Sequence, residues 1–173
     1  MKLIYTASQV REAEKPYIEA ADYDGYLMQR AADAVAAEAQ ELLHGKDKAK
    51  ILLLIGPGNN GADTIYAGAR LSAKGHSVDA VIFDSSEKNL ELIAREGGEG
   101  TRVLDPEHAL EQLAGYDLTI DGILGTGSSG AVRGSAGEYL GVLRAAQLDG
   151  KLGAVLAVDT PSGCLLYTSD AAD

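Results

Sequence analysis

The chain has 173 residues, 46% of them hydrophobic and 24% charged, which is the composition of an ordinary globular protein large enough for one domain with a core. Its formal net charge of −11 argues against a nucleic-acid partner, because binding phosphates through bulk charge needs clustered lysine and arginine. The single cysteine, Cys164, excludes a disulfide within the chain, and no apolar run approaches the roughly 20 residues that span a bilayer. We therefore expect a cytoplasmic protein with no membrane partner.

Two helices are predicted ahead of the first strand. Residues 6–20 begin with the capping-box pattern of Thr6 and Gln9, which typically starts a helix. Residues 25–43 are rich in alanine and are followed by Gly45, a plausible stop signal.

From residue 51 the predicted strands and helices alternate. The predicted strands cover residues 51–55, 77–83, 101–104, 117–121 and 154–158. The predicted helices cover residues 61–74, 86–96, 107–114 and 135–148. Regular alternation of this kind predicts an α/β fold with a parallel sheet and helices on both of its faces.

Three loops of unusual composition follow three of the predicted strands, at residues 56–63, 121–134 and 159–163. Ligands of such sheets bind beyond the carboxyl ends of the strands, so these loops are expected to meet at one site. In the first loop Gly56, Gly58 and Gly61 have the G-x-G-x-x-G spacing. That spacing lets backbone N–H groups approach a phosphate, although it also occurs in tight turns without a ligand.

Together the three loops resemble the YjeF N-terminal family, the NAD(P)HX epimerases. The family's GxGNNGGDG is similar to GPGNNGADT at residues 56–64, where Ala62 and Thr64 replace two family glycines. Its DxxxGTG motif with a glycine-rich stretch resembles residues 121–134, and its AVDxPSG motif resembles residues 157–163. The likeness covers roughly residues 5–163.

The resemblance implies a three-layer α/β/α Rossmann-like fold with a mostly parallel sheet and two extra N-terminal helices. It implies an isomerase that interconverts the R and S forms of hydrated NADH and NADPH, which carry a hydroxyl group at C6 of the nicotinamide ring. The product would feed an S-specific dehydratase, separate or fused. A potassium ion and a homodimer are further expectations from the family.

The resemblance also assigns roles to individual residues. It implies that Asn60, Asp121 and Ser162 bind potassium. From the residues alone, Asn60 could equally serve the turn, and Asp121 could cap its own loop. The substrate-binding residues implied by the family are Asn59, Asn60, Gly61, Ala62, Asp63, Gly125, Thr126, Gly127, Ser128, Ser129, Gly130, Ala131 and Asp159.

Asp159 is the predicted catalytic residue. It follows an apolar strand, and a buried carboxylate in that place would exchange protons near neutral pH. Epimerisation by ring opening, or by loss and return of water, needs such a proton transfer. The alternative is that Asp159 only caps the turn at residues 160–163.

The sequence leaves two other functions open. Asp84, about 20 residues after the glycines, would bind a ribose hydroxyl if the chain were the NAD(P)-binding module of a dehydrogenase. A non-catalytic binding or assembly module on the same fold is the second alternative. Retention of Asn60, Asp121, Asp159 and Ser162 together favours the epimerase.

We expect one domain at residues 1–163, shortened at its C-terminal end, and a tail at residues 164–173 that does not resemble the family. The three histidines show no spacing typical of a metal site and are predicted at the surface: His44, His76 and His108.

Overall fold

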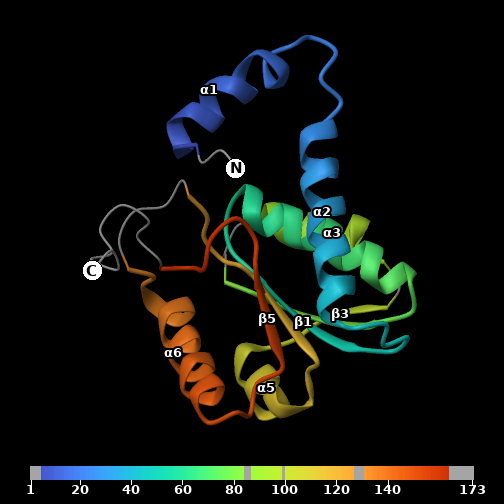
Figure 1. Cartoon of the computed structure of the whole chain (residues 1–173), viewed down its shortest axis with the longest axis vertical. Helices are drawn as coiled ribbons and strands as arrows, with labels where there is room; N and C mark the ends of the chain where they lie inside the picture. Colours follow the sequence, from blue (N-terminus) through green and yellow to red (C-terminus); the bar gives the residue numbers. More distant parts are fainter. Residues whose placement is uncertain (1–4, 84–86, 99, 127–130, 164–173) are drawn as a thin grey trace.

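A computed structural model describes residues 5–83, 87–98, 100–126 and 131–163. Within them one parallel sheet has the strand order β3-β2-β1-β4-β5 (Figure 1). Its strands are β1 (Lys50–Ile55), β2 (Ser77–Ile82), β3 (Thr101–Val103), β4 (Leu118–Gly122) and β5 (Ala154–Ala157). This is the start of the Rossmann order, with the switch point between β1 and β4. The predicted parallel α/β sheet is confirmed.

Strand β1 lies at the centre of the sheet because its side chains are apolar on both faces. Ile51, Leu53 and Ile55 pack into one core cluster, and Leu52 and Leu54 pack into the other. Since successive side chains of a strand point to opposite faces, a run of five apolar residues needs cover on both sides.

Helices provide this cover in two layers. One face carries α2 (Tyr26–Leu42), α3 (Asn59–Ala73) and α4 (Glu87–Glu96). The other carries α5 (Pro106–Glu111), the 3₁₀ helix η1 (Leu113–Gly115) and α6 (Gly134–Leu148). The result is the expected three-layer arrangement. None of the described helices has the length and apolar character needed to cross a membrane.

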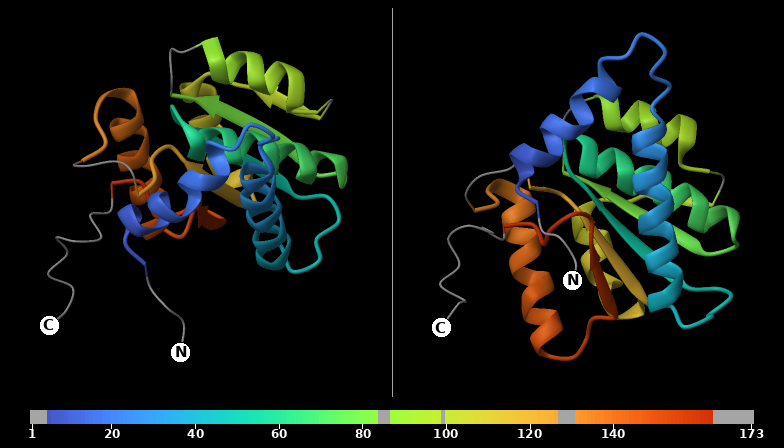
Figure 2. Two further views of the ribbon diagram at one scale, coloured as in Figure 1. Left: turned by 90° about the horizontal axis from the view of Figure 1, so that it is seen from above. Right: turned by 45° about the horizontal axis from the view of Figure 1, so that its top comes forward.

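Helix α1 (Ala7–Ile18) stands apart from these layers (Figure 2). The predicted capping box is present, because the amide of Gln9 donates to Oγ1 of Thr6 and the amide of Thr6 donates to Oε1 of Gln9. The side chains of Val10, Tyr17 and Ile18 are nevertheless exposed. The first N-terminal helix therefore forms as predicted but does not bury an apolar face against the sheet.

Two local expectations are corrected by the structure. Helix α3 begins at Asn59 rather than near residue 61, with Gly58 at its N-cap. Histidine 76 is buried, and its Nδ1 accepts a hydrogen bond from the amide of Ala49 while its Nε2 lies 2.6 Å from Nε2 of Gln40. Burial lowers the pKa of His76, chiefly through loss of solvent around the charged form.

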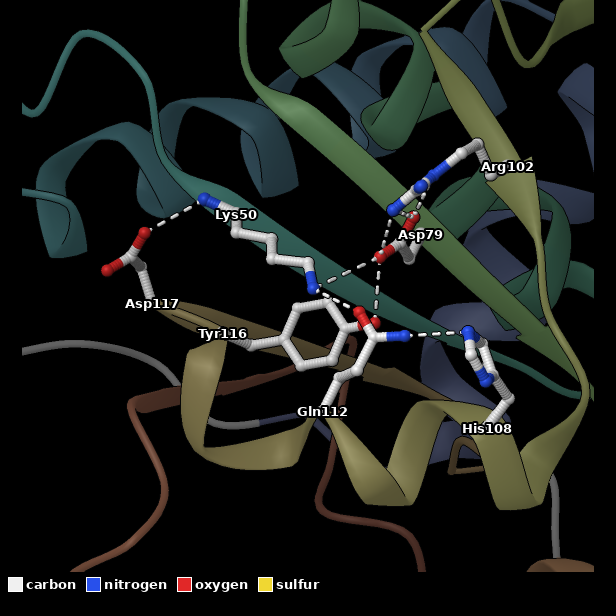
Figure 3. Close-up of polar contacts among 7 residues, drawn as sticks. All are labelled: Lys50, Asp79, Arg102, His108, Gln112, Tyr116 and Asp117. Carbon is white, nitrogen blue, oxygen red and sulfur yellow. Dashed lines mark hydrogen bonds and ion pairs between the residues drawn. The ribbon is translucent and has the colours of Figure 1, made fainter.

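A polar network joins β2 to its neighbours (Figure 3). Asp79 of β2 is fully buried and accepts hydrogen bonds from Arg102 Nε at 2.8 Å, Arg102 Nη2 at 3.0 Å and the Tyr116 hydroxyl at 2.8 Å. Lys50 Nζ lies 3.8 Å from the same carboxylate. Burial, and then the bond to Asp79, raises the pKa of Tyr116. The network satisfies a buried charge, and its bonds link β2, β3 and η1.

Candidate active site at the carboxyl ends of the strands

The loop after β1 is fixed by contacts from β4 and α4. Gly56 donates its amide to the carbonyl of Gly122, and Nδ2 of Asn89 donates to the carbonyl of Gly56 at 2.8 Å. A Cβ atom on Gly56 would lie 1.9 Å from the carbonyl oxygen of Ile123, so no larger residue fits. The first glycine of the motif is therefore required by close packing of two strand ends, whatever ligand binds there.

Asn60, on the first turn of α3, bridges to the loop after β5. Its Nδ2 donates to the carbonyl oxygen of Val158 at 2.9 Å, across 98 positions of sequence. The side-chain amide also lies against Gly125, where a Cβ atom would be 2.5 to 2.7 Å from its three outer atoms. The absence of a side chain at Gly125 therefore leaves room for the Asn60 amide, which joins the first loop to the third.

Asp121 and Ser162 join the loops after β4 and β5. The Ser162 hydroxyl donates to Oδ1 of Asp121 at 2.6 Å, and the Ser162 amide donates to Oδ2 at 2.8 Å. The amide of Leu124 donates to Oγ of Ser162 at 2.9 Å. Both side chains line a second pocket of about 450 Å³, between α6 and strands β4 and β5.

Thr126 and Asp159 form a further link between the same two loops. The amide and the hydroxyl of Thr126 donate to Oδ2 of Asp159 at 2.8 and 2.7 Å. Asp159 has a φ of 70°, in the left-handed region, and the amide of Thr160 donates to the carbonyl of Val158 around it. The expectation that Asp159 is buried is wrong: its side chain is exposed, because the turn lifts it out of the sheet.

These loops enclose a pocket of about 750 Å³. Its floor includes Asn59, Asn60, Asp63, Gly125, Thr126 and Asp159. Helix α1 covers one side with Val10, Arg11 and Glu14, and Arg11 is the one basic side chain among the described residues that line the pocket. A mostly preformed cavity of this size at the switch point is typical of a small-molecule site.

Asp63 is the buried carboxyl group of this pocket. Its side chain is 9% exposed, and in the described part of the chain its Oδ1 has no hydrogen-bond partner. Burial raises the pKa of Asp63 to about 6, and the charges of Asp159 and Glu14 add to the rise. The family resemblance implied that Asp63 binds the substrate, and nothing in the sequence indicated that its side chain is buried.

The remaining predicted site residues fall into three groups. Gly61 and Ala62 are buried in the first turn of α3, and Ala131 is exposed at the second pocket. Gly127, Ser128, Ser129 and Gly130 lie outside the described residues, as does Asp84 of the dehydrogenase alternative.

Sequence reasoning missed Asn89, which holds the carbonyl of Gly56 from α4. The available signal was its spacing. Asn89 lies three and four positions before the buried Leu92 and Ile93, so a polar residue occupies the inward face of an amphipathic helix.

The predicted potassium ligands are all hard oxygen donors, and they carry one carboxylate among neutral groups. Oxygen donors of this kind suit a hard cation. The structure brings Asp121 and Ser162 into contact, whereas Asn60 donates to the carbonyl of Val158 and, within the described residues, forms no hydrogen bond with either of them. The described residues contain no group of three or more His, Cys, Asp or Glu side chains that could hold a metal ion.

Comparison with known proteins gives a consistent family. The model of the family described as "YjeF-related protein N-terminus" matches residues 25–172. The bifunctional NAD(P)H-hydrate repair enzyme Nnr of Corynebacterium glutamicum is 34% identical over an alignment of 170 residues that covers 94% of this chain and 28% of that enzyme. The NAD(P)H-hydrate epimerase of Microbacterium testaceum is 35% identical over an alignment of 161 residues that covers 92% of this chain and 60% of that protein.

The yeast protein ynu0 has the same fold, with a TM-score of 0.72, 20% identity and coverage of 93% of this chain and 72% of that one. The chain spans roughly a third of the length of the bifunctional relatives. The match extends over most of the sequence, and the described parts of its three motif-bearing loops meet at one edge of the sheet. The chain belongs to the family of YjeF-related protein N-termini.

Proposed function

We propose that this chain epimerises the R and S forms of hydrated NADH and NADPH. The observation that carries the proposal is the pocket at the switch point, where Asn59, Asn60 and Asp63 of α3 face Thr126 and Asp159 of two other loops. Relatives that match nearly all of this chain are named for NAD(P)H-hydrate repair or NAD(P)H-hydrate epimerase.

The pocket supplies the groups that the reaction needs. Peptide N–H groups at the start of α3 suit the substrate's phosphates. Asp159 is exposed to the pocket, and Oδ2 is anchored by Thr126, which leaves Oδ1 for the substrate. We propose that Asp159 accepts the proton of the C6 hydroxyl group.

We propose that Asn60, Asp121 and Ser162 hold a potassium ion. The ion would supply positive charge beside the buried Asp121 carboxylate. Asp121 and Ser162 already join the loops after β4 and β5, and Asn60 itself donates to the carbonyl oxygen of Val158.

An S-specific NAD(P)HX dehydratase is the proposed functional partner, because it consumes one of the two epimers. The homodimer and the cytoplasmic location stay predictions.

The test is direct. Racemic hydrated NADH is mixed with an S-specific dehydratase, with and without this chain, in potassium chloride or in tetramethylammonium chloride. The dehydratase alone consumes the S half quickly and the R half only at the spontaneous rate. We expect the chain to accelerate consumption of the R half, and to do so more strongly in potassium.

The same test separates the alternatives. If the chain leaves the R half at the spontaneous rate but binds the hydrated nucleotide in calorimetry, a non-catalytic binding module is the correct interpretation. If it oxidises or reduces a substrate with unmodified NAD(P), the dehydrogenase interpretation holds.

A further inference from the structure

The carboxyl group best placed to give up a proton in the pocket is not the predicted Asp159. Asp63 is the fifth residue of α3, is more than nine-tenths buried and lines the same 750 Å³ pocket. Its Oδ1 is shielded from solvent and has no partner in the described part of the chain. A buried, unsatisfied carboxyl oxygen is costly, so its retention calls for an explanation.

The two carboxyl groups of the pocket have opposite surroundings. Asp159 is exposed, and its Oδ2 accepts two hydrogen bonds from Thr126. Asp63 is enclosed, and the charged groups facing it are Asp159 from the β5 loop and Glu14 from α1, with Arg11 on the same helix lining the pocket. Burial and two negative neighbours favour the neutral acid at Asp63. Pairs of carboxyl groups with such contrasting environments typically divide acid and base roles.

We propose that Asp63 is a second catalytic residue, the general acid that works with Asp159 as general base. This inference rests on the proposed function. In the ring-opening route, Asp159 accepts the proton of the C6 hydroxyl group and the O–H electron pair forms the C6=O bond. The C6–N1 bond breaks with its electron pair on N1, and N1 takes the proton of the Asp63 carboxyl group.

Rotation about the C5–C6 bond then presents the other face of the aldehyde to N1. Reversal of the same steps returns both protons and gives the other epimer. No atom or electron is gained or lost, and no co-reactant is needed.

The experiment measures conversion of the separated R form by chromatography, in potassium chloride from pH 5 to pH 8.5, so that no coupling enzyme limits the rate. We expect kcat/KM of the unaltered chain to fall with rising pH above about 6, as Asp63 loses its proton. We expect D63N to lower kcat by about 100-fold or more with KM changed less than about threefold. D149N is the matched control, because Asp149 is an exposed carboxylate at the C-terminal end of α6 and pairs with Lys151.

The outcomes are distinct. An active unaltered chain with a D63N variant that keeps more than a third of kcat overturns the role of Asp63 and leaves the epimerase function standing. A raised KM at unchanged kcat makes Asp63 a binding residue and also overturns the inference. An inactive unaltered chain overturns the epimerase function and this inference with it. If D63N does not fold, D63E compared with D63Q contrasts a carboxyl group with an amide of the same length.

Discussion

Ser162 binds both oxygens of Asp121, with its hydroxyl 2.6 Å from Oδ1 and its amide nitrogen 2.8 Å from Oδ2. Asp121 is only 6% exposed, so these bonds replace much of the water that a carboxylate requires. One serine therefore both satisfies the buried charge and holds the loop after β5 against the loop after β4. The serine of the family's PSG motif therefore has a structural role here that does not depend on any substrate.

Replacement of Ser162 by alanine tests this relationship. S162A removes the hydroxyl donor to Asp121 and the acceptor for the Leu124 amide, so we expect a loss of about 1–3 kcal/mol in the free energy of unfolding. Urea titration measures it. S77A is the control, since Ser77 is exposed on β2, and we expect it to stay within about 0.5 kcal/mol.

The same variant tests the cation. Potassium chloride in place of tetramethylammonium chloride is expected to raise the unfolding midpoint of the unaltered chain and not that of S162A. Equal midpoints of the unaltered chain in the two salts would count against a potassium site at Asp121 and Ser162.

The protonation of Asp63 makes stability depend on pH. Its folded-state pKa of about 6 lies above the ordinary 3.8, so the native state holds this proton more tightly than the unfolded chain does. Its contribution to stability is full below about pH 4 and is lost as the pH rises through 6. The free energy of unfolding of D63N minus that of the unaltered chain is therefore expected to rise by roughly 2–3 kcal/mol from pH 4 to pH 7.5. Urea titrations at both pH values measure the difference, and a constant difference would contradict it.

Asp159 combines an expected catalytic role with an unusual backbone. Asparagine tolerates a φ of 70° and can still accept a hydrogen bond from Thr126. The free energy of unfolding of D159N is therefore expected to lie within about 1 kcal/mol of that of the unaltered chain. A β-branched residue does not tolerate that φ, so D159V is expected to cost about 1–3 kcal/mol. Activity of D159N is expected to fall by about 100-fold or more. A D159N variant with full activity would leave Asp159 with only its turn-forming role.

The strand pattern was predictable because Ile51 to Ile55 are apolar without a break, and only a strand covered on both faces uses such a run. The convergence of the loops at residues 56–63, 121–134 and 159–163 followed from the parallel sheet, because its strands end at one edge. Of these loops, residues 127–130 lie outside the described part.

Burial of single polar side chains was not predictable in the same way. Asp63 follows the glycine-rich loop, and it is enclosed by α1 and the loop after β5. Asp159 follows the end of a strand, and a left-handed turn directs it outward. The buried side chain of His76 likewise contacts Gln40, which lies 36 positions away in the sequence. Such outcomes depend on tertiary neighbours, which local periodicity does not report.

The network at Asp79 offers a test of the structural charge cluster, away from the pocket. R102M removes two hydrogen bonds from a fully buried carboxylate and leaves the Tyr116 hydrogen bond and the Lys50 ion pair in place, so we expect a loss of about 1–3 kcal/mol in the free energy of unfolding. Adding D79N to R102M is expected to recover part of the loss, because the uncompensated charge is gone. R144M, an exposed arginine of α6, is the control. Additive effects of D79N and R102M would show that the two side chains do not depend on each other.

Gly125 controls the position of the Asn60 amide. A methyl group at residue 125 would lie 2.5 Å from Nδ2 and 2.7 Å from Oδ1 of Asn60, whose Nδ2 is held by Val158. G125A is therefore expected to displace the amide, to cost about 1–2 kcal/mol in stability through the lost bond, and to raise KM for the hydrated nucleotide. G141A is the control, because Gly141 lies on an exposed face of α6 with open space around its Cβ position. We expect it to keep KM unchanged and to raise the free energy of unfolding by up to about 1 kcal/mol. If G125A and G141A have the same KM, the Asn60 amide does not contact the substrate, and its bond to Val158 serves only to hold two loops together.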